Sequence, residues 1–131
     1  MPYKIQYYND GGILVKGEQL VTGKEIEELN NILYETEAKI KNISYQIIDF
    51  TGVKNISISN EEVDNISRQD KRACSINPDM LIAVISDQDV IYGLARMWEV
   101  KSGSSIIQAQ VFRRHDEALQ WIQLKRKTPV D

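Results

Sequence analysis

The chain has 131 residues, 42% apolar and 27% charged, and its 16 lysines and arginines against 19 aspartates and glutamates leave a formal net charge of −3. This length suits one domain with a hydrophobic core of its own, and the composition argues against a disordered or fibrous protein. Because the cations are spread along the chain rather than clustered, we do not expect it to bind nucleic acid.

The cysteine count and the apolar stretches bear on the cellular compartment. Cys74 is the one cysteine, so an internal disulfide framework is excluded, and its place in a helical pattern predicts a core residue. The first residues have no apolar signal segment, and stretches such as 80–85 are far too short to span a bilayer. We therefore expect a cytoplasmic protein without a membrane span.

The first forty residues predict a hairpin and a helix. Residues 3–8 alternate between polar and apolar side chains, a glycine-containing turn follows, and 13–15 are again apolar. Thr22 and Glu25 have the spacing of a capping box, in which each side chain bonds the backbone N–H of the other residue. Apolar residues then recur at helical spacing, which predicts a helix from about 23 to 41.

The middle of the chain predicts two strands buried on both faces, each followed by a helix. The strands are 45–50 and 80–85, which are short and almost continuously apolar. Ser59 and Glu62 form a second capping box, and the apolar spacing of the helix that starts there continues to Asn77.

The C-terminal third predicts a helix, a strand and a last helix. Ser86 and Asp89 are expected to cap the first of these helices, 106–112 alternates as a strand does, and the last helix starts at about Asp116. The cations at 125–127 complement its dipole. The order is ββαβαβαβα, which predicts an α/β domain with a single, mostly parallel sheet, helices packed on it and an antiparallel hairpin at one edge.

Two strings extend this interpretation. Residues 48–53 read Ile-Asp-Phe-Thr-Gly-Val, which is similar to the Asp-Leu-Ser-x-Val that ends the central strand of STAS domains, and 117–122 read Glu-Ala-Leu-Gln-Trp-Ile. The second string is similar to the Glu-Ala-x-x-Trp-Leu of SpoIIAA-like C-terminal helices. Together with the element order, they make 1–131 resemble a single STAS domain (sulfate transporter and anti-sigma-factor antagonist) of the SpoIIAA-like branch, related in fold to CRAL-TRIO lipid-binding domains.

The resemblance implies a phosphorylation site. Regulatory STAS proteins are phosphorylated on a serine of Asp-Ser-Ser-Gly at the start of the helix after the central strand, and the charge releases a partner. The matching stretch here is Ser57-Ile58-Ser59-Asn60, so Ser59 aligns with the phosphoacceptor, while Ser57 replaces the Asp and is a second candidate. Ser59 also has a structural role as the helix N-cap, and both interpretations stay open.

Polar residues that follow the buried strands form a candidate binding rim. In open α/β sheets, ligands gather beyond the carboxyl ends of the strands, where we expect Asp49 and Thr51, although Asp49 could instead accept backbone N–H bonds. Asp70 lies on the apolar side of the second helix, where a carboxylate usually pairs with a cation or lies at the margin of the stripe. Asp70 is a further candidate for ligand binding.

The segment 92–99 predicts a contact surface, because aromatic residues, Met and Arg are enriched in interface cores. Its candidates are Tyr92, Arg96 and Met97.

No catalytic or metal site is expected, since the lone His115 starts the last helix, far from Ser59 or Cys74, and no cofactor is implied. We predict a non-enzymatic regulatory or adaptor domain that binds a protein partner, with a homodimer as one form of this. The alternatives are a small-ligand or lipid-binding domain and, third, an enzyme.

Overall fold

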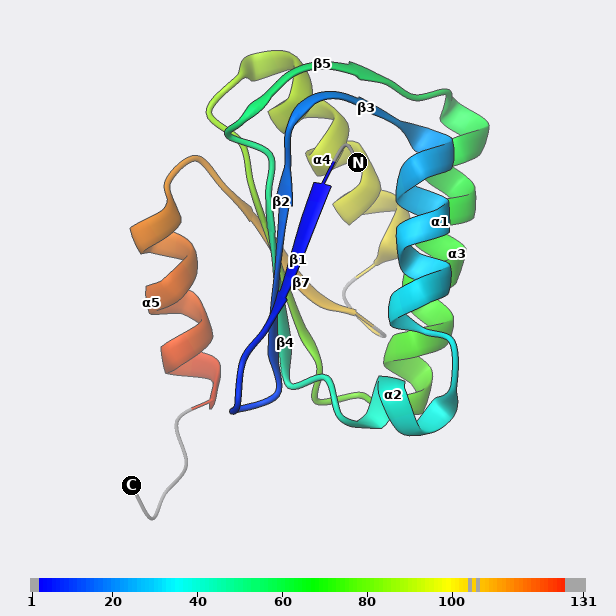
Figure 1. The fold of residues 1–131 in the computed structure, drawn as a ribbon, viewed down its shortest axis with the longest axis vertical. Helices are drawn as coiled ribbons and strands as arrows, with labels where there is room; N and C mark the ends of the chain where they lie inside the picture. Colours follow the sequence, from blue (N-terminus) through cyan, green and yellow to red (C-terminus); the bar gives the residue numbers. More distant parts are fainter. Residues whose placement is uncertain (1–2, 104, 106, 127–131) are drawn as a thin grey trace.

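The computed structural model describes residues 3–103, 105 and 107–126. Within this part the chain forms seven strands and five helices (Figure 1). The strands are β1 (Tyr3–Tyr7), β2 (Gly12–Gly17), β3 (Gln19–Thr22), β4 (Tyr45–Asp49), β5 (Val53–Ser57), β6 (Leu81–Ile85) and β7 (Gln108–Phe112). The helices are α1 (Gly23–Leu33), α2 (Glu37–Lys41), α3 (Asn60–Ile76), α4 (Asp89–Ser102) and α5 (His115–Arg126).

The main sheet has five strands in the order β1-β2-β4-β6-β7. The hairpin strand β1 runs antiparallel to β2, and all the other pairs are parallel. Helix α5 alone packs on one face of the sheet, and α1 to α4 lie on the other (Figure 1). The predicted α/β fold with a mostly parallel sheet and an antiparallel edge is confirmed.

Alternation along the central strands divides the core into two parts. In β4, Tyr45 and Ile47 pack with Ala118 and Ile122 of α5, in a cluster that also includes alternate residues of β6. Ile48 belongs to the larger cluster beneath α1, α3 and α4. A strand that must fill both clusters is apolar at nearly every position, which is why 45–50 and 80–85 read as continuous apolar runs.

The predicted helix over 23–41 is in fact two helices. Helix α1 ends at Leu33, and Thr36 then caps α2, accepting a hydrogen bond from the backbone N–H of Lys39 at 3.1 Å. The threonine hydroxyl competes with the helical pattern of backbone bonds and starts a new helix. The break lets both Tyr34 and Ile40 be buried.

A second, two-stranded parallel sheet pairs β3 with β5, neither of which the sequence predicts as a strand. This two-stranded sheet, called the ribbon of β3 and β5 below, spans the top of the molecule in Figure 1, from the end of the main sheet to the start of α1 and α3. Gln19, the first residue of β3, has a φ of 55° where the chain turns away from β2. The ribbon covers the carboxyl ends of the main strands on the side of α1 and α3.

The expected cap at Ser86 is wrong. The N-cap of α4 is Gln88, and Ser86 is wholly buried, accepting from the Gln88 backbone N–H at 3.3 Å. The Gln88 side chain instead donates to the Val53 carbonyl at 2.7 Å, fixing α4 to β5.

The last helix starts at His115 rather than Asp116. Residues 106 and 127, which the predicted strand and the cationic run include, lie outside the described residues.

Candidate functional site

An apolar cavity of about 80 Å³ lies between the sheet and helices α1, α3 and α4. Its deep part is lined by buried residues such as Ile66 and Ile82, whereas Phe50, Ile56 and Ile58 in its lining are half-buried. The cavity therefore opens toward the end of β4 and the segment from β5 to α3, where ligands of open α/β sheets gather. The lining consists of Ile26, Leu29, Asn30, Gln46, Ile48, Phe50, Ile56, Ile58, Val63, Ile66, Asp70, Ile82, Val84, Ile91, Leu94, Ala95 and Trp98.

A buried carboxylate, Asp70 of α3, forms part of the cavity wall. Tyr34 donates its hydroxyl to Asp70 Oδ1 at 2.7 Å, and Trp98 donates its indole N–H to Oδ2 at 2.9 Å. Asn30 Nδ2 adds a longer contact to Oδ1 at 3.4 Å, and Gln46 donates to the Tyr34 hydroxyl at 2.6 Å. One polar network thus joins residues from α1, α3, α4 and β4 beside an otherwise apolar space.

The expectation that Asp70 pairs with a cation or lies at the margin of its stripe is wrong. Its side chain is buried and its donors are uncharged, because Arg68 and Arg72 of the same helix point to solvent. Burial, the largest effect, raises the pKa of Asp70 to about 6, and the hydrogen bonds from Tyr34 and Trp98 offset only part of the rise. The apolar surroundings of Asp70 are therefore the main reason why its pKa lies above the ordinary value.

Ser57 and Ser59 lie at the mouth of the cavity and are exposed. They alternate with Ile56 and Ile58, so the segment presents its isoleucines to the cavity and its serines to solvent. The backbone N–H of Glu62 donates to Ser59 Oγ at 3.1 Å, and that of Ser59 donates to Glu62 Oε1 at 2.8 Å. The predicted capping box is confirmed, and it leaves Ser59 on the surface.

Asp49 and Thr51 form a local turn that is not part of the cavity. Asp49 Oδ1 accepts from the Thr51 backbone N–H at 2.8 Å and from its hydroxyl at 2.7 Å. Because strand side chains alternate, Asp49 lies on the same face of β4 as Ile47, whereas Ile48 lines the cavity. The structure therefore brings Asp49 and Thr51 together but does not bring them to Asp70.

The three contact candidates on α4 do not share one face. Tyr92 is half-buried beneath the guanidinium of Arg113, which lies 4.0 Å from its ring centroid, and Arg96 pairs with Glu99 at 2.5 Å. Met97 is 37% exposed and lies on a different side of the helix. Two further exposed apolar residues of α4, which are not among the predicted contact candidates, lie near Met97 by helical spacing. These are Val90 and Val100.

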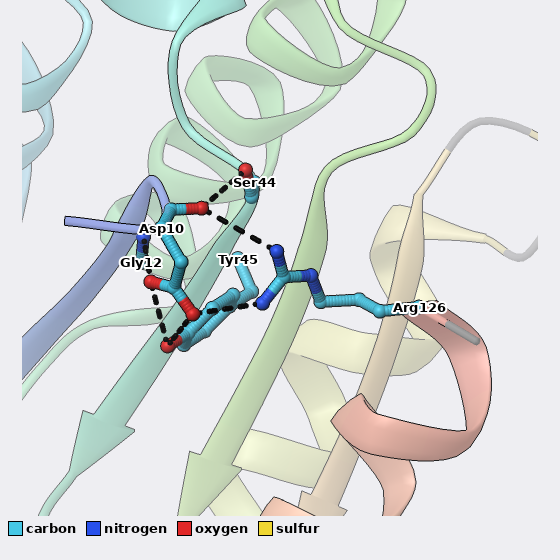
Figure 2. Close-up of polar contacts among 5 residues, drawn as sticks. All are labelled: Asp10, Gly12, Ser44, Tyr45 and Arg126. Carbon is cyan, nitrogen blue, oxygen red and sulfur yellow. Dashed lines mark hydrogen bonds and ion pairs between the residues drawn. The ribbon is translucent and has the colours of Figure 1, made fainter. Parts of the chain in front are cut away.

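A second polar cluster ties the last helix to the first hairpin (Figure 2). The Asp10 carboxylate accepts from the Gly12 N–H at 3.1 Å, from the Tyr45 hydroxyl at 3.0 Å and from Arg126 Nη1 at 2.9 Å, and Ser44 Oγ donates to the Asp10 carbonyl at 3.0 Å. Burial acts to raise the pKa of Asp10, but the bonds from Arg126, Gly12 and Tyr45 outweigh it and lower the pKa. Tyr45 begins β4, so the cluster lies at the opposite end of that strand from the cavity mouth, and we assign it a structural role.

Groups that enzymes use are not assembled in the described part of the chain. His115 starts α5, on the opposite face of the sheet from α3, which carries Cys74 and follows Ser59 (Figure 1). Burial, with the nearby Asp70, raises the pKa of the Cys74 thiol to about 12. Across residues 3–103, 105 and 107–126, no three His, Cys, Asp or Glu side chains are grouped so that they could hold a metal ion. Nor does any helix among these residues have the length and apolarity to cross a bilayer.

Solved structures of other proteins share this arrangement. The anti-sigma factor antagonist SpoIIAA in its unphosphorylated form has a TM-score of 0.58 at 6% identity, covering 92% of this chain and 97% of SpoIIAA. The Bacillus cell fate determinant SpoIIAA in its phosphorylated form has a TM-score of 0.59 at 7% identity, covering 92% of this chain and 98% of SpoIIAA. A sulfate transporter family protein from Wolinella succinogenes has a TM-score of 0.63 at 17% identity, covering 94% of this chain and 93% of that one. The chain has the STAS fold.

An uncharacterized protein from Shewanella loihica with a SpoIIAA-like fold also matches, with a TM-score of 0.55 at 17% identity, covering 92% of this chain and 91% of that one. No protein-family model matches the sequence, and no curated protein matches it. The TM-scores of 0.55 to 0.63 show a shared fold, whereas identities of 6% to 17% transfer no residue role to this chain. The roles of individual residues therefore rest on the geometry of this chain.

Proposed function

We propose that this chain is a non-enzymatic regulatory domain that binds a protein partner through an exposed apolar face of α4. The supporting observation is the face itself: Val90 and Val100 are 72% and 73% exposed, and Met97 is 37% exposed. Helical spacing places these residues on one side, with Gly93 among them and Arg96 beside them. A regulatory role agrees with the STAS fold, which SpoIIAA, an anti-sigma factor antagonist, also has.

The cavity lining links the candidate phosphorylation site to the helix that carries this face. Leu94 is one turn from Val90 and from Met97, and it lines the cavity together with Ile58, the residue before Ser59. A phosphate on Ser59 adds about 1.5 to 2 negative charges, and it would repel the Glu62 carboxylate that the Ser59 backbone N–H now binds. We propose that this charge weakens or redirects partner binding, with Ser57 as the second acceptor.

Affinity capture from native extract tests the α4 face with wild type and two aspartate variants. Val100→Asp places a charge on the face, and Leu124→Asp is the matched control, because Leu124 is 74% exposed but lies on α5, across the sheet. A partner identified by mass spectrometry should be retained by wild type and Leu124→Asp and lost from Val100→Asp. A partner that both variants retain, or both lose, contradicts the proposal.

A second copy of the chain is one partner that would fit the same face. Sedimentation velocity of the purified protein distinguishes this case, because a homodimer would dissociate on Val100→Asp and persist on Leu124→Asp.

The rival lipid-binding function has less support, since pockets for drug-sized ligands typically occupy about 300–1,000 Å³ and the cavity has about 80 Å³. An enzymatic function has still less support, because His115 lies across the sheet from the hydroxyl of Ser59 and the thiol of Cys74.

A further inference from the structure

The Asp70 carboxylate is a buried acid without a positive partner. None of the ion pairs among the described residues includes it. A carboxylate can accept about four hydrogen bonds, and Asp70 receives three from uncharged donors, of which the one from Asn30 is long at 3.4 Å. An ionised carboxylate in such a place is costly unless a cation or further donors compensate for the lost water.

The surroundings of Asp70 specify what could compensate it. Most of the cavity lining is apolar, and the polar residues in it are Asp70, Asn30 and Gln46. Gln46 is already committed to Tyr34 at 2.6 Å and Asn30 to Gln69 at 3.1 Å. A pKa of about 6 leaves the Asp70 carboxyl largely ionised at neutral pH. The complementary ligand therefore has an apolar body and one cationic donor.

We propose that the cavity binds a small primary amine with a hydrocarbon body, whose ammonium group pairs with Asp70 while the hydrocarbon lies against Leu29, Ile66 and Ala95. The size agrees, because a single water needs about 10–15 Å³ of such space, so about 80 Å³ holds several groups of that size. A branched amine of a few carbons matches this volume. The site is separate from the α4 face and does not depend on the proposed partner.

The test compares three probes of nearly the same shape: isopentylamine, isopentanol and isovalerate, which are cationic, neutral and anionic at neutral pH. Each is titrated into uniformly ¹⁵N-labelled wild-type protein, and the two indole N–H resonances are followed by NMR. The Trp98 indole bonds Asp70, whereas Trp121 packs against Phe112 on the other face of the sheet and serves as the internal control. The amine should shift the Trp98 resonance with saturation and leave Trp121 in place.

The amine should bind at least about tenfold more tightly than the alcohol, the ratio typical of a charge-assisted over a neutral hydrogen bond, and isovalerate should not bind. Asp70→Asn should abolish the preference for amine over alcohol. Ala95→Leu, which fills the cavity from its buried wall, should abolish both shifts and keeps the test valid if Asp70→Asn does not fold. Equal affinity for amine and alcohol, no shift of Trp98, or an amine shift that survives Ala95→Leu would each overturn the proposal.

Discussion

The indole N–H of Trp98 donates to the carboxylate of Asp70, with 2.9 Å between nitrogen and oxygen. The bond joins α4 to α3 inside the core, where the two residues are 8% and 5% exposed. A buried tryptophan needs a partner for its N–H, and here that partner is an ionisable group. The packing of two helices is therefore coupled to the protonation of one carboxyl.

Stability should depend on pH through Asp70. The unfolded chain releases this proton near the ordinary pKa of 3.8, whereas the folded chain holds it to about 6. The folded state thus binds more protons between these values, so the free energy of unfolding falls as pH rises, by about 3 kcal/mol from this residue. Asp70→Asn removes this contribution. Urea unfolding across the range should show the variant gaining stability relative to wild type with rising pH, and parallel curves would contradict the assignment.

Trp98→Phe should be more harmful at neutral pH than in acid. The change removes a donor to Asp70, and a hydrogen bond to a charged group is worth about 1.5–3 kcal/mol against about 0.5–1.5 kcal/mol for a neutral one. The loss of stability should therefore grow as Asp70 ionises. Trp121→Phe is the matched control, because Trp121 contacts the Phe112 ring at 5.7 Å between centroids and lies far from the network. Equal losses for Trp98→Phe at both pH values would show that packing alone is affected.

The Ser59 cap and the proposed switch can be separated by three substitutions. Ser59→Ala removes the oxygen that accepts from Glu62 N–H and should cost about 1 kcal/mol. Ser59→Asn and Ser59→Asp both keep a capping oxygen and should retain stability in thermal unfolding. The Asp variant alone adds charge, so only it should weaken partner capture. If Ser59→Asn weakens capture as much as Ser59→Asp does, charge is not the cause.

The sequence predicts the main sheet because burial leaves a local pattern. Doubly covered strands read as apolar runs, and capping boxes mark where α1 and α3 begin. The ribbon of β3 and β5 has no such signal: Gln19–Thr22 is four residues long with its first two exposed, and its partner lies beyond two helices and a strand. Pairing between such short segments is decided by the tertiary fold.

The candidate site was predictable in its parts but not in its grouping. The helical pattern identifies Asp70 as an acid on an apolar side, yet its donors are Tyr34, which follows α1, and Trp98 of α4, and their meeting depends on how these helices pack. Ser59 caps α3 as its spacing to Glu62 predicts, whereas Ser57 ends β5, and the cavity behind them is lined by residues from the sheet and three helices. No local spacing encodes such an assembly.

Gly12→Ala should disrupt the cluster that holds α5 to the hairpin (Figure 2). A Cβ on Gly12 would lie 2.1 Å from Tyr45 Cζ and 2.3 Å from its hydroxyl oxygen, so the ring must move and Asp10 loses a donor. Overpacking of this kind typically costs about 1–3 kcal/mol. The double variant with Tyr45→Leu makes room for the methyl group, so the two losses should not add, and strict additivity would contradict a clash. Gly93→Ala is the control, because a Cβ there meets nothing within 4 Å on exposed α4, and it should stabilise the helix by about 0.5–1 kcal/mol.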